Sequence, residues 1–280
     1  MCLLVVSSPN STPRKKDLEN ASCNNPHGFG YAVIAGNKII TGRGMSSKKI
    51  IKEFLAVRKQ YPNSYAMYHA RFATHGVRNE ENCHPFQVGG SDLTYLAHNG
   101  ILPVHIEPTD KRSDTRILAE DMLPSMGGIT ALDNPNLYGM LEKWSAGSKI
   151  AIFTLDPVAM YDCYIINEDL GAWDNDGNWW SNDSYKSTYL GKYWNWGTTD
   201  DPTACGAGLE DDYAMCYTCG VAVSEDENPY YCLECGSCYD CSAVVNDGCL
   251  CWTPERDKWA TAQHKLQSAG KYDGQYDFGF

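Results

Sequence analysis

The sequence lacks any long uninterrupted apolar run. None of its segments approaches the roughly 18–20 consecutive apolar residues that cross a bilayer. The opening MCLLVV is too short for the apolar core of a signal peptide, and no basic residue precedes it. We therefore expect no membrane span and no secretion, and we expect a cytoplasmic location.

Basic residues are absent from one long stretch. No Lys or Arg occurs between Lys192 and Arg256, whereas that stretch holds twelve acidic residues, which equals the whole net charge of −12. An acidic chain does not favour nucleic-acid binding, because binding needs a basic face. The uneven charge indicates separate parts: a nearly neutral domain over 1–195, an acidic linker over 196–212, a cysteine-rich module over 213–255 and a polar tail over 256–280.

Short apolar strands alternate with amphipathic helices over the first 195 residues. Periodicity and capping residues predict helices from Ser46 or Ser47 to Tyr61, from Ser113–Asp114 to before Pro124, and from Pro135 to Trp144. We expect a hairpin turn at 174–178, where the acidic spacing lacks the glycine and final acid of a calcium loop. Strands are predicted at LLVV (3–6), FGYAVIAG (29–36), NKIITG (37–42), SYAMYHA (64–70), LTYLAH (93–98), SKIAIFTLD (148–156) and CYIIN (163–167). This succession predicts an α+β fold with two packed antiparallel sheets.

Four short motifs accompany a cysteine directly behind the initiator methionine. They are HARFATHG (69–76), NCHPF (82–86), AHNG (97–100) and SDT (113–115). Together with Cys2 they resemble the class II, N-terminal-nucleophile glutamine amidotransferases, over about residues 2–185. The resemblance implies the four-layer αββα sandwich of N-terminal nucleophile hydrolases. A small chain of this kind with a cysteine-rich end is also similar to phage-encoded amidotransferases.

The resemblance implies a catalytic role for three residues. Once Met1 is removed, Cys2 carries a thiol and a free α-amine, so that one residue supplies both nucleophile and base. The α-amine, with an ordinary pKa of about 7.7–8.0, would accept the thiol proton and pass it to departing ammonia. The Asn99 side-chain amide and the Gly100 backbone N–H would donate to the oxyanion.

The resemblance also implies how the substrate is held. Arg71 would bind the α-carboxylate of glutamine through its planar guanidinium, and Asp114 would bind the α-ammonium and could also cap its helix. Thr74, His75 and Gly76 would shape the same pocket. The sequence departs from the family at NNPHGFG (24–30), where an arginine that engages the nucleophile is absent. Either Asn24 or Asn25 takes over that role, or the role is lost.

Eight of the thirteen cysteines are closely spaced near the end of the chain. They form three CxxC pairs and one CxC pair: Cys216 and Cys219, Cys232 and Cys235, Cys238 and Cys241, Cys249 and Cys251. In a reducing compartment this spacing predicts two structural zinc ions, each held by four thiolates. Only two residues separate Cys235 from Cys238, which favours a cross-brace pairing over two sequential ribbons.

The leading hypothesis is a glutamine amidotransferase that hydrolyses L-glutamine and passes ammonia to a partner synthase. No Walker A loop or other nucleotide-binding motif occurs in the chain. One alternative is a γ-glutamyl amide hydrolase without an ammonia acceptor, because NCHPF also resembles stand-alone members that act on other γ-glutamyl amides. The other is a non-catalytic, zinc-dependent interaction protein on the same scaffold.

Overall fold

The structure is a computed structural model, and it describes residues 2–73, 78–107, 109–186, 214–215 and 222–223. The chain consists of two units, Met1–Glu210 and Asp211–Phe280. In the second unit, β11 (Ala214–Met215) and β12 (Ala222–Val223) form an antiparallel pair. The eight closely spaced cysteines lie outside the described residues, and so do the expected linker and tail.

The larger sheet of the first unit contains the start of the chain at its centre. Its strand order is β3-β2-β4-β1-β10-β9, and neighbouring strands are antiparallel. Because β1 pairs with β4 on one side and β10 on the other, Cys2, the residue before β1, lies beside two inner strands. The strands are β1 (Leu3–Ser7), β2 (Phe29–Ala35), β3 (Lys38–Gly44), β4 (Ala66–Ala70), β9 (Ala172–Trp173) and β10 (Asn178–Trp180).

The smaller sheet has four antiparallel strands in the order β5-β6-β7-β8. The strand β6 is nine residues long and ends at Asn99, so the Asn-Gly pair lies where this strand leaves the sheet. The strands are β5 (Phe86–Val88), β6 (Ser91–Asn99), β7 (Lys149–Thr154) and β8 (Cys163–Ile166).

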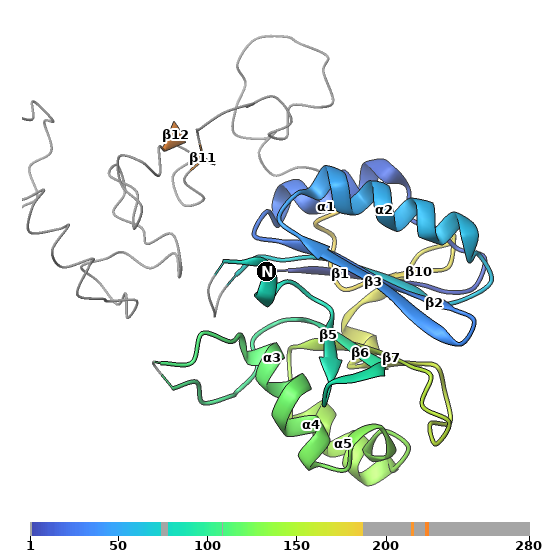
Figure 1. Cartoon of the computed structure of the whole chain (residues 1–280), viewed down its shortest axis with the longest axis vertical. Helices are drawn as coiled ribbons and strands as arrows, with labels where there is room; N and C mark the ends of the chain where they lie inside the picture. Colours follow the sequence, from blue (N-terminus) through green and yellow to red (C-terminus); the bar gives the residue numbers. More distant parts are fainter. Residues whose placement is uncertain (1, 74–77, 108, 187–213, 216–221, 224–280) are drawn as a thin grey trace, which may run out of the picture. The chain divides into compact units, whose positions relative to one another are not determined.

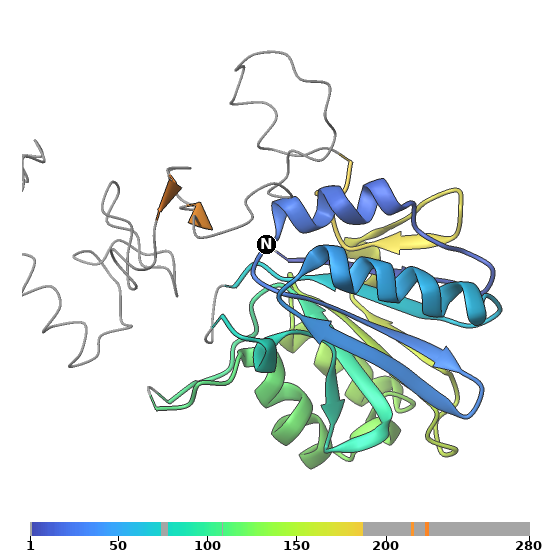
Figure 2. The same ribbon diagram turned by 45° about the horizontal axis from the view of Figure 1, so that its top comes forward.

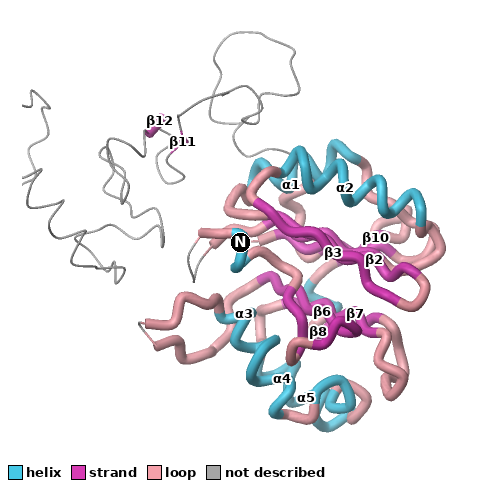
Figure 3. Tube along the Cα trace, viewed as in Figure 1, coloured by secondary structure: helices cyan, strands magenta, loops and turns pink. Residues whose placement is uncertain are grey.

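Three apolar clusters separate four layers. Leu18 of α1 (Lys15–Asn24) and Phe54 of α2 (Ser47–Gln60) pack on the outer face of the larger sheet, and Figure 2 shows both helices lying across it. A second cluster, which includes Val6, Met67 and Phe153, fills the space between the sheets. The third covers the outer face of the smaller sheet with the helices that follow β6. This αββα order, visible in Figures 1 and 3, is the one that the resemblance implies.

The predicted helices agree with the structure at two places and differ at a third. Ser46 caps α2 by accepting a hydrogen bond from Lys49 N, and α5 (Pro135–Trp144) has the predicted bounds. The second helix was expected to end before Pro124, which is wrong. It runs as α3 (Asp114–Ile117), a π-helical segment η2 (Leu118–Met122) and α4 (Leu123–Ser125). A proline fits here because it lies at the start of a new short helix, where its missing N–H needs no partner.

Several short elements were not anticipated, although the hairpin turn at 174–178 was. Helix α1 is mostly polar, so its apolar face is only two or three residues wide and gives little periodicity. The others are β5, β9, β10 and the single turns η1 (Glu80–Asn82), η3 (Gly128–Ala131) and η4 (Glu168–Leu170). None of the described helices is both long and apolar enough to cross a lipid bilayer.

Candidate active site

Cys2 lies at the entry to β1 and is nearly buried, with 9% of its surface exposed. Its Sγ accepts a hydrogen bond from Phe72 N at 3.2 Å and lies 3.4 Å from Phe72 O. Burial raises the pKa of the thiol, which the Phe72 backbone hydrogen bond and the charge of Arg71 oppose only in part. The thiol is therefore protonated at rest, and a base must remove its proton before it can attack.

Residues from four separate segments surround one small cavity next to Cys2. Those that the sequence analysis singled out for a role are Cys2, Arg71, Gly100 and Asp114. They come from the start of β1, the end of β4, the end of β6 and the start of α3. The cavity of about 10 Å³ has room for about one water molecule, so a larger molecule would enter only if its wall moved. The other described residues that line it are Phe72, Ala73, His84, His98, Ser113 and Thr115.

The two residues expected to hold the ends of the substrate are both buried. Arg71 is 2% exposed, and burial lowers the pKa of its guanidinium from a value so high that the group stays charged. Asp114 Oδ1 accepts hydrogen bonds from Thr115 N and Oγ1, and Oδ2 accepts one from Leu102 N at 2.9 Å. These bonds fix the carboxylate in place before a ligand arrives.

The expectation that Asp114 could cap its helix is wrong. Ser113 is the residue before α3, and its side chain accepts the hydrogen bond from Arg116 N. Because a serine performs the capping, the Asp114 carboxylate faces the cavity and the loop that carries Leu102 instead.

The two residues of the Asn-Gly pair differ in where they lie relative to the cavity. Gly100 lines it with a φ of +149°, and a Cβ there would collide with Ser148, so that only glycine fits this close approach. Asn99 is buried, donates from Nδ2 to Ser181 Oγ at 2.9 Å, and does not belong to the described lining. Its Oδ1 has no hydrogen-bond partner among the described residues.

Three buried histidines pack together beside the site, and two of them, His84 and His98, line the cavity. His69 and His84 stack with ring centroids 3.9 Å apart, His98 N donates to His84 Nδ1, and His69 Nε2 lies 2.9 Å from His98 O. Burial lowers the pKa of His69 to about 3 and of His98 to about 4, and that of His84 well below its ordinary value. All three are therefore neutral at neutral pH, and they bring β4, NCHPF and β6 together.

The remaining predicted residues divide into two groups. Thr74, His75 and Gly76 lie outside the described residues. Asn24 and Asn25 both reach the turn after β10, where Asn24 Nδ2 donates to Ser184 O at 2.6 Å and Asn25 Nδ2 to Ser184 Oγ at 3.2 Å.

Sequence reasoning missed two residues beside the site, Ser181 and Asn182. Asn182 Nδ2 donates to the backbone carbonyl of Cys2 at 2.7 Å, and Ser181 Oγ accepts from Leu4 N at 2.9 Å. No motif marks them, because they lie about 180 residues from Cys2 and come near it only through the pairing of β1 with β10.

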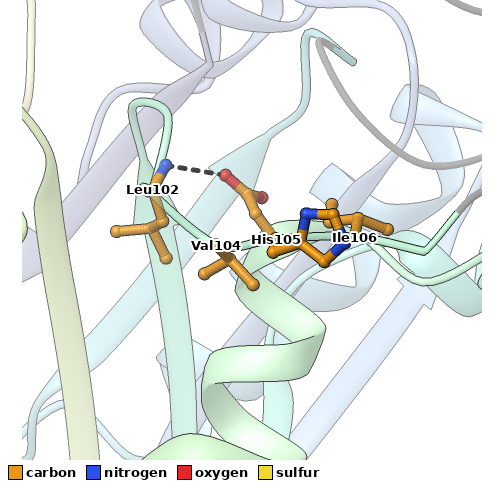
Figure 4. A pocket seen from close by; sticks show the side chains of 5 residues that line it. Leu102, Val104, His105 and Ile106 are labelled. Carbon is orange, nitrogen blue, oxygen red and sulfur yellow. Dashed lines mark hydrogen bonds between the residues drawn. The ribbon is translucent and has the colours of Figure 1, made fainter.

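A second cavity adjoins the first at Asp114. It measures about 200 Å³, and Leu102, Val104, His105 and Ile106 form the rest of its lining, as Figure 4 shows. The Asp114 carboxylate thus lies between two hollows, one leading toward Cys2 and one toward the loop after β6.

Metal ligands are not gathered in the described part of the chain. Within residues 2–73, 78–107 and 109–186, no three His, Cys, Asp or Glu side chains are placed to hold a metal ion. The predicted zinc ligands lie elsewhere in the sequence, outside those ranges.

Comparison with known proteins gives distant structural likenesses. No family model and no curated protein matches the chain. It is similar to the glutamine phosphoribosylpyrophosphate amidotransferase from B. subtilis complexed with ADP and GMP (19% identity, TM-score 0.43), over 68% of this chain and 44% of that one. The allosteric regulatory enzyme of purine biosynthesis gives 17% identity and a TM-score of 0.40, over 68% and 44%. A glutamine aminotransferase class-II domain protein from Silicibacter pomeroyi gives 15% identity and a TM-score of 0.33, over 64% of this chain and 87% of that one. The chain thus spans less than half the length of the first of these proteins.

Proposed function

We propose that this chain is a class II glutamine amidotransferase that hydrolyses the side-chain amide of L-glutamine through a thioester on Cys2. One observation carries the proposal: a buried cysteine next to the chain start shares a small cavity with an arginine, an aspartate and a glycine of positive φ from three distant segments. This set offers a nucleophile, one partner for each charged group of an amino acid, and a backbone N–H beside the reacting carbon.

The reaction begins with transfer of the thiol proton to the α-amine that removal of Met1 exposes. The thiolate attacks the carboxamide carbon, and the Asn99 amide and the Gly100 N–H stabilise the oxyanion. The α-ammonium then gives its proton to the amide nitrogen, the C–N bond breaks, and ammonia leaves a glutamyl thioester. Water attacks that thioester, glutamate departs, and the proton returns to the thiol.

The surroundings of Cys2 favour an amine as the base. The three neutral histidines have pKa values far below 7 and would bind a proton only weakly. An α-amine has an ordinary pKa of about 8, so it accepts the thiol proton more readily, and it belongs to the same residue as the nucleophile. Arg71 and Asp114 would hold the zwitterionic end of glutamine and so fix the distance from its carboxamide to Sγ.

A labelling experiment tests this function. Purified protein is expected to have lost Met1 by intact mass, to release ammonia from L-glutamine, and to be alkylated once by diazo-oxo-norleucine. Cys2→Ala should lower ammonia release by at least about 10⁴-fold and abolish labelling. Cys163→Ala, on β8 away from the cavity, serves as the control and should keep both. Retention of Met1 in active protein, or ammonia release by Cys2→Ala, contradicts the mechanism.

Ammonia released here would pass to a separate synthase, because the chain carries no nucleotide-binding motif for a second reaction. We propose the acidic, cysteine-rich module as the part that contacts that partner, with two zinc ions as its structural support. Assaying glutamine beside a panel of γ-glutamyl amides separates this function from that of a general γ-glutamyl amide hydrolase.

A further inference from the structure

We infer that Ser181 and Asn182, adjacent residues that follow β10, are positioning residues that set the nucleophile and the oxyanion donor of the same reaction centre. The inference rests on the proposed function, since it concerns how Cys2 and Asn99 are aligned. One dipeptide contacts both halves of the site: Asn182 holds the backbone of Cys2, and Ser181 holds the side chain of Asn99.

The contact with Cys2 is direct and short. Asn182 Nδ2 donates to Cys2 O at 2.7 Å, and one residue further along, Ser181 N donates to Leu4 O at 2.9 Å while Leu4 N donates to Ser181 Oγ. The backbone of residues 2–4 is thereby fixed on the side that faces β10. Because the base is the α-amine of Cys2, fixing that backbone orients the nucleophile and its base together.

The contact with Asn99 involves a hydroxyl that can both donate and accept. In this structure Asn99 Nδ2 donates to Ser181 Oγ, while Asn99 Oδ1 is buried without a described partner. A half-turn of the amide would let Ser181 donate to Oδ1 and would free both Nδ2 hydrogens for an oxyanion. In either orientation Ser181 fixes the plane of the amide, and Ser181 is itself only 1% exposed.

A chain of hydrogen bonds connects this dipeptide to the end of α1. Ser184 N donates to Asn182 Oδ1 at 3.0 Å, and Ser184 in turn accepts hydrogen bonds from Asn24 and Asn25. The asparagines of NNPHGFG therefore influence the nucleophile through the 181–184 turn. An amide network thus occupies the place where the resemblance would have an arginine.

Conservative substitutions provide the test. Asn182→Asp keeps the size and the acceptor for Ser184 N but replaces the donor to Cys2 O with a carboxylate oxygen. We expect kcat for glutamine to fall by about 10- to 100-fold with KM changed by less than about threefold, because alignment and not binding is lost. Asp183→Asn, at an exposed residue that pairs only with Lys186 among the described residues, is the matched control and should keep the wild-type kcat. All rates are expressed per site that diazo-oxo-norleucine titrates, so that unfolded protein does not count.

A double-mutant cycle separates positioning from a loss of general stability. Ser181→Ala should lower kcat by about 10-fold or more in the wild-type background and by a clearly smaller factor in Asn99→Ala, because the contribution through Asn99 is then gone and only the bond to Leu4 N remains to be lost. Equal losses in both backgrounds, or an Asn182→Asp kcat equal to that of the control, would overturn the inference. If Ser181→Ala does not fold, the Asn182→Asp comparison decides alone. Absence of glutaminase activity in the wild-type protein would contradict the proposed function instead.

Discussion

At the scale of single residues, burial determines which groups in the site can carry charge. Cys2, His69, His84 and His98 all lie in the interior, and burial favours the neutral form of each. Arg71 is as deeply buried but stays charged, because the pKa of a guanidinium starts so high. The site therefore presents the permanently charged Arg71 beside a protonated thiol and three neutral rings.

The neutral histidines predict that stability rises with pH. Their pKa values in the folded chain lie below the ordinary 6.5, so the unfolded chain binds more protons in the window from about 6.5 down to about 4. The stability is fully present above the unfolded pKa and is lost as pH falls through this window. Each histidine should cost about 1–2 kcal/mol between about pH 6.5 and about pH 5.

Urea unfolding followed at several pH values measures this slope. The variant His69→Gln should flatten it. A free energy of unfolding that stays constant between these pH values contradicts the expectation.

At the scale of elements, one buried arginine joins helix α2 to the loop after β1 and to the loop before β4. Arg58 of α2 is 1% exposed, and its guanidinium donates to the carbonyls of Ser8 and Ser11 after β1 and of Tyr61 and Ser64 before β4. The distances range from 2.6 to 2.8 Å. Sequence reasoning predicted α2 from its periodicity and cap but did not place this arginine inside, because a charged residue is usually exposed.

Arg58→Lys is expected to destabilise the protein by about 2–4 kcal/mol. A lysine has three donors and no planar fork, so at least one of the four carbonyls loses its hydrogen bond to residue 58. Chemical denaturation measures the change, and Lys59→Gln, at the exposed neighbour in the same helix, should lie within about 0.5 kcal/mol of wild type. A loss below about 1 kcal/mol for Arg58→Lys would show that the network contributes little.

At the scale of the whole molecule, the chain combines a layered domain with an acidic, cysteine-rich part. The layered domain buries three apolar clusters as its core. The sequence over 213–255 is short for a core of its own, and closely spaced thiolates are the usual substitute.

The purified protein is expected to contain two zinc ions per chain, as measured by elemental analysis after dialysis. Cys232→Ser should lower the zinc content, because it removes one of eight predicted ligands. Cys205→Ser should not, because Cys205 lies outside the closely spaced pairs. A wild-type protein without zinc contradicts the metal-site prediction and leaves the proposed glutaminase mechanism untouched.

Much of the layered domain could be predicted from local pattern. The seven predicted strands and helices α2 and α5 are observed, because alternating or helical apolar periodicity and side-chain caps identify them within a few residues. The short β9 and β10 strands and the polar α1 could not be predicted, because their stability comes from pairing and packing and not from their own sequence.

The sequence by itself determined the kinds of residue available for chemistry: a cysteine next to the start, an arginine, an Asn-Gly pair and an aspartate in order along the chain. Only the tertiary structure decided that Cys2, Arg71, Gly100 and Asp114 share one cavity and that Ser113 caps the helix that carries Asp114. It alone brought Ser181 and Asn182 to the nucleophile. The physical reason is that β1 pairs with β10 from the far end of the domain, and such long-range pairing leaves no mark in local sequence.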